Sequence, residues 1–140
     1  MDHIQDTQIN LEVRTAYGRC KHYLDGVLTF KPHQEDGIQW MLYRELQQYN
    51  PKGGLLSDDM GLGKTIQTIS TIMGNPVDGP TLILVPPNLL SQWFSEIKRF
   101  SKNYLTSLED GTFLVGQYHG KARDTMNLEN YNIVLASINS

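Results

Sequence analysis

Asp58-Asp59-Met60-Gly61-Leu62-Gly63-Lys64-Thr65 is the stretch of this sequence that decides its fold. An apolar Gly-Leu-Leu precedes it, and apolar residues with helical spacing follow it. A glycine-rich turn between a strand and a helix, ending in Gly-Lys-Thr, is the arrangement that cradles the phosphates of a nucleotide. The stretch therefore predicts a phosphate-binding loop.

Each residue type in this turn has a physical role in binding phosphate. Gly61 and Gly63 allow backbone N–H groups to face the β- and γ-phosphates, because no side chain stands in the way. Lys64 adds a point charge, and the Thr65 hydroxyl can hold Mg²⁺. The helix that begins there directs its positive end, roughly half a charge, at the phosphates. We expect the nucleotide to lie against the whole loop, which also contains Asp58, Asp59, Met60 and Leu62.

The stretch departs at one position from the general pattern G-x-x-x-x-G-K-[ST], because Asp58 stands where the first glycine is expected. Since Gly-Lys-Thr also occurs by chance, the flanking residues must decide. Lys52–Ser57 reads as a strand, and Ile66–Met73 carries apolar side chains at helical spacing. These flanks favour nucleotide binding over the alternative, which is a glycine-rich turn with a solvent-facing lysine.

Five segments, in order, resemble the motifs of the SWI/SNF-type ATPases, the helicase-like DNA translocases of superfamily two. The loop resembles motif I of this family, in which the first glycine is normally absent. Pro32-His33-Gln34 with Gly37–Met41 resembles the adenine-reading Q-like motif. The other segments are residues 81–90 with Gln92-Trp93 and Glu96 (motif Ia), Tyr118-His119-Gly120 with Arg123 (a tract common in the family), and residues 132–137 (the strand leading into motif Ib).

The resemblance covers residues 28–140 and has one weak point, since Ala136-Ser137-Ile138 stands where the family usually has a Thr-Thr-Tyr-like end. Within the family, the Gly-Gly-Leu-Leu lead-in and the Asn-Leu-Leu-Ser-Gln-Trp tract are most similar to the repair-type translocases that often carry a RING finger.

The resemblance implies an α/β fold of the P-loop NTPase (RecA-like) class, with helices on both faces of a parallel sheet. It implies ATP and Mg²⁺ as cofactors, with Lys64 and Thr65 in the catalytic role and Gln34 reading the adenine. It also implies double-stranded DNA as the partner of the complete motor, held in part by Pro87, Asn88 and Ser137, and chromatin or repair proteins as further partners.

The same resemblance implies that part of the machinery is missing from these residues. The family's Asp-Glu box, which holds Mg²⁺ and positions the attacking water, and the second lobe with its arginine finger would follow Ser140. Asp58-Asp59 cannot replace that box, because it lies on the phosphate loop itself. We therefore expect the front part of a first motor lobe, either a fragment or a truncated gene product, that does not hydrolyse ATP alone.

Proline residues and apolar runs in the sequence predict where helices and strands begin and end. Residues 1–27 read as an N-terminal extension with one short strand at Ile9–Val13, and residues 28–140 read as the partial lobe. Pro32 marks the first turn of a helix to about Gln48. The apolar run Thr81–Val85 predicts a strand buried on both faces. Further elements are expected as a helix from an Asn88 N-cap to about Phe100 and strands at 113–118 and 132–136. Alternating strands and helices imply βαβ units and a parallel sheet.

Several candidate residues have an ordinary structural alternative. Gln34 either reads adenine or caps a helix, and Asn88 either contacts DNA or caps a helix. Trp40 and Trp93 lie on apolar helix faces, where core packing is favoured over base stacking. His33 and His119 are not expected to bind a metal, because neither has a second ligand at metal spacing. The basic cluster Lys98, Arg99 and Lys102 suits a helix C-terminus as well as it suits a DNA contact.

Composition narrows the classes of partner and compartment. The formal net charge of −3 provides no bulk attraction to nucleic acid, so a DNA contact must be local. The single cysteine, Cys20, excludes an intramolecular disulfide and a cysteine zinc site. The sequence contains no apolar run of about 18 residues and no secretion leader. It therefore predicts an intracellular protein, nuclear if the organism is a eukaryote, that does not span or bind a membrane.

Two functions remain open from the sequence. The first is the ATP-binding lobe of a DNA-dependent motor, and the second is a non-catalytic remnant or interaction module that keeps the fold. A small-molecule kinase of the P-loop class is a weaker third, because the Q-like and Ia segments have no place in one.

Overall fold

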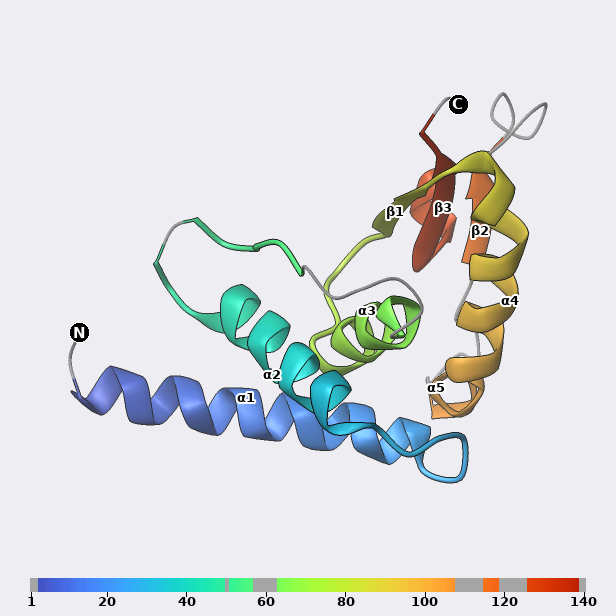
Figure 1. The fold of residues 1–140 in the computed structure, drawn as a ribbon. Helices are drawn as coiled ribbons and strands as arrows, with labels where there is room; N and C mark the ends of the chain where they lie inside the picture. The colour runs from blue at the N-terminus through green and yellow to red at the C-terminus, as the bar shows by residue number, and fades with distance from the viewer. Residues whose placement is uncertain (1–2, 50, 57–62, 108–114, 119–125, 139–140) are drawn as a thin grey trace. The chain divides into compact units, whose positions relative to one another are not determined.

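The computed structural model describes residues 3–49, 51–56, 63–107, 115–118 and 126–138 (Figure 1). The chain forms two compact units, residues 1–75 and residues 76–140. Each unit has its own core and is described by itself.

The first unit consists of three helices, α1 (His3–Leu24), α2 (Pro32–Leu46) and α3 (Lys64–Gly74), which pack against one another (Figure 1). The buried side chains of α1 recur every three or four residues, so they form one face of the helix. This face packs against Ile38 and Leu42 of α2 and is extended by Tyr17, whose ring stacks on Phe30 at a centroid distance of 6.1 Å. The buried residues of α1 are Ile9, Val13, Ala16, Cys20 and Leu24.

The predicted short strand at Ile9–Val13 is wrong, because these residues lie within α1. The spacing of Ile9, Val13, Ala16 and Cys20 is the helical signal that the sequence already contained. It is weak as a pattern because Leu11, which is exposed, interrupts the apolar face.

The predicted helix from Pro32 is confirmed, although it ends at Leu46 rather than near Gln48. The predicted strand at Lys52–Ser57 is wrong for its described part, since residues 52–56 form neither helix nor strand, and Leu55 is 82% exposed. The guanidinium of Arg44 donates to the carbonyl oxygen of Gly53 at 2.6 Å and to that of Pro51 at 2.8 Å. These bonds hold the segment against α2, so the carbonyl group of Gly53 is engaged there instead of in a sheet ladder.

The second unit contains the strands β1 (Thr81–Val85), β2 (Val115–Tyr118) and β3 (Ile133–Ser137), in the order β1-β3-β2 and all parallel. The helix α4 (Leu90–Phe100) packs against β2 and β3 (Figure 1). The unit is completed by η1 (Pro87–Leu89), α5 (Lys102–Ser107) and η3 (Leu128–Asn130). The predicted parallel α/β sheet is confirmed, as are the strands predicted near 81–85, 113–118 and 132–136, although residues 113 and 114 lie outside the described residues.

Burial differs between the strands of this sheet. All five residues of the central strand β3 are buried. In β1, Ile83 and Val85 are buried, whereas Leu82 is 61% and Leu84 59% exposed. The prediction that this run is buried on both faces is therefore wrong, because Leu82 and Leu84, which share one face of β1, are exposed.

The predicted N-cap at Asn88 is also wrong. Helix α4 begins at Leu90, and Asn88 lies inside the preceding 3-10 turn, in which the N–H of Leu89 donates to the Pro86 carbonyl oxygen at 3.0 Å. The two prolines 86 and 87 suit this tighter turn because neither has an N–H to bond. The predicted helix to Phe100 is otherwise confirmed, and its residues Leu90 and Ile97 are buried.

Neither tryptophan is fully buried, although core packing is the expectation for both. Trp93 is half-buried on α4, but Trp40 is 39% exposed and its ring lies over the backbone of Gly54. None of the helices in the described part of the chain combines the length and the hydropathy needed to cross a membrane.

Candidate nucleotide-binding site

The predicted phosphate loop is described only at its carboxyl end. Asp58, Asp59, Met60, Gly61 and Leu62 lie outside the described residues, whereas Gly63, Lys64 and Thr65 lie within them.

Gly63 occupies a backbone conformation that favours glycine. Its φ of 86° and ψ of 40° are in the left-handed region, which costs another residue about 1–2 kcal/mol. A Cβ built on this residue would collide with the side-chain amide nitrogen of Gln34 and lie 3.1 Å from Ile66 Cγ2. The backbone angle therefore favours glycine here, and a larger residue would also have to displace the Gln34 amide.

Helix α3 begins directly after Gly63, as the sequence predicted. The Gly63 carbonyl accepts from the N–H of Gln67 at 3.1 Å, so Gly63 is the N-cap of the helix. Glycine has no side chain to cap the first-turn amides, and α3 has no acidic residue in its first turn. Among the described residues, no side chain caps this end of the helix, and its positive end suits an anion.

Lys64 and Thr65 lie in this first turn and are both half-buried. The Thr68 hydroxyl donates to the Lys64 carbonyl oxygen at 2.8 Å, which adds a bond to the first turn. Two side chains of the types that bind phosphate and its metal ion therefore stand on an ordered helical turn next to a left-handed glycine.

Gln34 is brought to this turn by the packing of α2. Its side chain is buried, and its Oε1 accepts from the backbone N–H of Lys31 at 2.9 Å, which caps the first turn of α2. The capping role considered from the sequence is thus observed. It does not exclude adenine recognition, because an amide oxygen has two lone pairs and the amide nitrogen two hydrogens. The pairing of Gln34 with Gly63 joins residues far apart in the sequence.

Both apolar and polar side chains of α3 are buried. Ile66, Ile69 and Met73 are buried, as the spacing predicted, and so are the polar residues Gln67, Ser70 and Thr71. Gln67 approaches α2 so closely that a Cβ at Gly37 would collide with its Oε1. No local sequence pattern marks Gln67, because its contact with a glycine on another helix depends on how the helices pack.

The described residues place no cluster of metal-binding side chains beside Thr65, the predicted Mg²⁺ ligand. Among the described residues, no group of three or more His, Cys, Asp and Glu side chains lies close enough to hold a metal ion. A Mg²⁺ ion bound by one hydroxyl and nucleotide phosphates needs no such cluster. His33 is half-buried on α2, whereas His119, Gly120 and Arg123 lie outside the described residues.

The predicted DNA-contacting residues meet at the carboxyl edge of the sheet in the second unit. Val85 and Ser137 are register partners, and the N–H of Ile138 donates to the Val85 carbonyl oxygen at 3.0 Å. Pro87 and Asn88, two and three residues after β1 has ended at Val85, are exposed. Ser137 is buried, so of these residues Asn88 is the one whose polar side chain is open to a phosphate.

The basic cluster of the second unit suits a helix C-terminus. Lys98 and Arg99 lie in the last turn of α4, where positive charge is favourable. The ammonium of Lys98 lies 5.6 Å from the ring centre of Phe94. Lys102 follows on α5 and is exposed.

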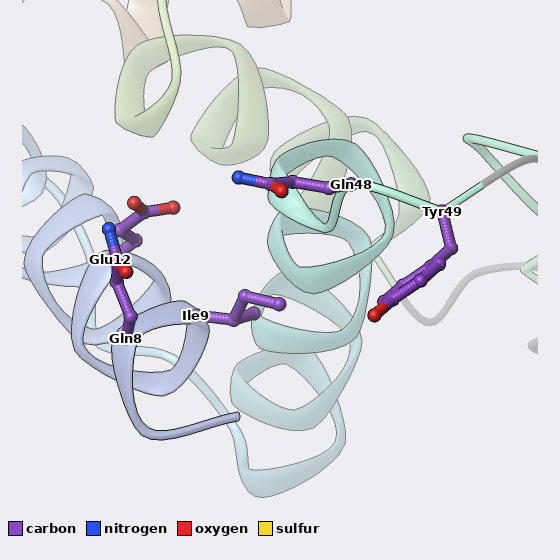
Figure 2. A pocket seen from close by; sticks show the side chains of 5 residues that line it. All are labelled: Gln8, Ile9, Glu12, Gln48 and Tyr49. Atoms are coloured by element: carbon purple, nitrogen blue, oxygen red, sulfur yellow. The ribbon is translucent and has the colours of Figure 1, made fainter. Parts of the chain in front are cut away.

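A small cavity in the first unit lies away from these residues. Gln8, Ile9 and Glu12 of α1 line it together with Gln48 and Tyr49, which follow α2 (Figure 2). Its volume of about 20 Å³ suffices for a single water molecule, so it is not a nucleotide site.

Comparison with known proteins identifies the family. The sequence model of the SNF2-related domain matches residues 33–140. The chain belongs to the SNF2-related domain family. The match begins at the start of α2 and includes Gln34, Gly63, Lys64 and Thr65.

Individual relatives agree with this family. The ATP-dependent helicase rhp16 of Schizosaccharomyces pombe is 37% identical over 111 residues, a match that covers 78% of this chain and 12% of that protein. The ATP-dependent DNA helicase DDM1 of Arabidopsis thaliana is 49% identical over 74 residues, which covers 51% of this chain and 9% of that protein. The human lymphoid-specific helicase is 40% identical over 95 residues, covering 66% of this chain and 11% of that protein.

A solved structure shows the same fold. The SWI2/SNF2 ATPase core of Sulfolobus solfataricus, in complex with double-stranded DNA, superimposes with a TM-score of 0.62 at 29% identity and covers 79% of this chain. This SNF2-related chain therefore has the RecA-like P-loop fold that its sequence resembles. It spans 21% of that structure and about a tenth of the length of the curated relatives it matches.

Proposed function

We propose that this chain is the ATP-binding part of a DNA-dependent ATPase of the SNF2 type. The observation that carries the proposal is the pairing of Gln34 with Gly63 at the start of α3. This pairing brings an amide suited to a purine edge next to an uncapped helix N-terminus suited to phosphate. Its residues lie within the family match.

In this proposal the parts of the site have separate roles. The first-turn amides of α3 and the Lys64 ammonium hold the phosphates, together with the loop residues Asp58–Leu62. The Thr65 hydroxyl holds Mg²⁺, which neutralises charge on the phosphate oxygens. The Gln34 amide reads the adenine edge, because its donor and acceptor match the pair of groups that a purine presents.

The proposed DNA contact lies in the second unit. Pro87, Asn88 and Ser137 follow the carboxyl ends of β1 and β3, where open α/β sheets place ligand-binding loops. The relatives' names refer to helicases, and the Sulfolobus core is bound to double-stranded DNA. We infer that the complete motor tracks duplex DNA and acts with chromatin or repair proteins, in the nucleus if the organism is a eukaryote. The RING-associated repair branch remains our preferred subgroup.

Catalysis is proposed for the complete motor and not for these 140 residues. Phosphoryl transfer needs a metal held from two sides, a positioned water and a cation at the γ-phosphate. Residues 1–140 contribute Lys64 and Thr65 to that set. We therefore expect no DNA-stimulated ATP hydrolysis by these residues alone. We also propose the division into an N-terminal extension of residues 1–27 and a partial lobe of residues 28–140.

Titration calorimetry with ATP and Mg²⁺ tests the proposal. Lys64→Ala removes a charge-assisted contact, which costs about 1.5–3 kcal/mol, or roughly tenfold to more than a hundredfold in affinity. The matched control is Lys52→Ala, because Lys52 is exposed and lies before the phosphate loop. Equal ATP affinity in wild type and Lys64→Ala would contradict the proposal.

A further inference from the structure

We propose that α1 braces the far end of the phosphate-binding helix, and that Arg19 is a positioning residue for the nucleotide site. This inference rests on the proposed ATP binding. It assigns a role to a helix that lies before residue 33, where the family match begins.

Helix α1 shares its core with the site's supporting helices. Ile9, Val13, Ala16 and Cys20 form one buried cluster with Ile38 and Leu42 of α2. Helix α1 also contacts α3 (Figure 1). The first unit is therefore closed by a helix from outside the matched region.

Helices α1 and α3 approach each other closely at Gly74, the last residue of α3. A Cβ at Gly74 would lie 2.8 Å from the backbone oxygen of Ala16, so the two helices meet backbone to backbone there. The guanidinium Nε of Arg19 donates to the Gly74 carbonyl oxygen at 3.0 Å. The smallest side chain in the helix thus permits an approach that Arg19 then secures.

Arg19 also supplies a charge that α3 lacks. Helix α3 has no basic residue in its last turn, where positive charge would interact favourably with the carbonyl end of the helix. Arg19 provides this charge from another helix. A second side chain acts next to it, since the amide nitrogen of Asn75 donates to Glu45 Oε2 of α2 at 3.0 Å.

Holding this end constrains the other. Helix α3 has 11 residues, so it is a rod about 16 Å long. Lys64 and Thr65 occupy its first turn, and Arg19 bonds to its last residue. A tilt or rotation allowed at Gly74 therefore displaces the groups that face the phosphates.

The test uses the 140-residue chain with Arg19→Ala, Arg19→Lys and the control Arg14→Ala, since Arg14 is exposed on the same helix. ATP affinity is measured by calorimetry at a temperature at which circular dichroism shows each variant to be folded. Arg19→Ala is expected to weaken ATP binding about threefold to tenfold, which corresponds to a fraction of the charge-assisted contact at Lys64. Arg19→Lys is expected to recover part of this loss, and Arg14→Ala to bind as wild type does.

A second readout separates positioning from overall stability. Hydrogen exchange of the amides of residues 64–68 is expected to quicken in Arg19→Ala, while exchange within α2 stays as in wild type. If Arg19→Ala does not fold, Arg19→Gln, which keeps a donor without the charge, replaces it. Wild-type ATP affinity and unchanged exchange in the folded variant would overturn the inference. Failure of wild type to bind ATP would instead overturn the proposed function, and the exchange measurement would still decide whether Arg19 orders α3.

Discussion

The described residues of the first unit bury their apolar side chains between three helices, whereas those of the second unit bury theirs around one central strand. In the first unit, the buried faces of α1, α2 and α3 all turn toward one another. In the second, β3 is buried along its whole length while β1 alternates between buried and exposed residues. The first unit thus packs helix against helix, whereas the second packs a helix and two outer strands around a strand that is buried along its whole length.

This difference has a functional consequence. The proposed phosphate site is the end of a helix, so its geometry depends on everything that packs along that helix, including α1. The proposed DNA contact lies on loops that follow strands, so its geometry depends on the register of β1 and β3. Mutations far from the first site are therefore expected to affect it, whereas the second is expected to depend on the sheet alone.

The largest expected effect tests the difference in burial between β3 and the exposed face of β1. Leu135→Ala removes a fully buried side chain and is expected to lower the free energy of unfolding by about 2–5 kcal/mol. Leu84→Ala, in the exposed row of β1, is expected to change it by about 0.5 kcal/mol or less. Denaturant titration measures both values. Similar losses in the two variants would show that β1 is covered on both faces.

Gly63→Ala is expected to combine a stability effect with a binding effect. The left-handed backbone costs alanine about 1–2 kcal/mol, and its Cβ must displace the Gln34 amide. ATP affinity is expected to fall by at least tenfold in calorimetry.

The control for this variant is Gly18→Ala, at an open position within α1. Replacing a helical glycine there is expected to stabilise the chain by about 0.5–1 kcal/mol, so the two alanine substitutions have opposite signs. If Gly63→Ala changed neither stability nor ATP affinity, the position of the Gln34 side chain would not depend on this glycine.

Gln34→Ala is expected to weaken adenine nucleotides by about 1 kcal/mol more than guanine nucleotides, because the base edge loses its partner. It also removes the cap of α2, with a loss of about 0.5–2 kcal/mol in stability. Paired titrations with ATP and GTP measure the first effect and thermal unfolding the second. Gln39→Ala, at an exposed position of the same helix, serves as the control. Equal binding of ATP and GTP by wild type would leave Gln34 with the capping role only.

The smallest effect at neutral pH concerns Cys20. Burial raises the pKa of this thiol to about 12, so it stays protonated in the folded chain. In the unfolded chain the thiol has a pKa of about 8.5. The stability that comes from keeping Cys20 protonated in the folded chain is complete below that pH and is lost as the pH rises toward 12. Burial, with Glu35 nearby, also raises the pKa of Tyr17, which acts in the same direction at higher pH.

Unfolding titrations between pH 7 and pH 10.5 are expected to show this decline. A thiol-specific disulfide reagent at pH 8 is expected to react with Cys20 only after denaturant is added, because the side chain is fully buried. Rapid reaction in the folded chain would show that α1 separates from α2 and α3 often enough to expose Cys20.

The sequence by itself determined the helices that begin at Pro32 and after Gly63 and the three parallel strands, and it predicts the phosphate-binding loop. These features depend on neighbouring residues: proline at a helix start, glycine before a helix, and uninterrupted apolar runs in strands. Such patterns are local, so they can be recognised before the chain is folded.

Only the tertiary structure decided how these elements are used. It placed Gln34 against Gly63 and bound Arg19 to Gly74, pairs that are separated by tens of residues in the sequence. It made residues 9–13 part of a helix, engaged the Gly53 carbonyl with Arg44 in place of a strand partner, and left one face of β1 exposed. Each outcome depends on which surface lies opposite a residue, and that is set by long-range packing, not by local sequence.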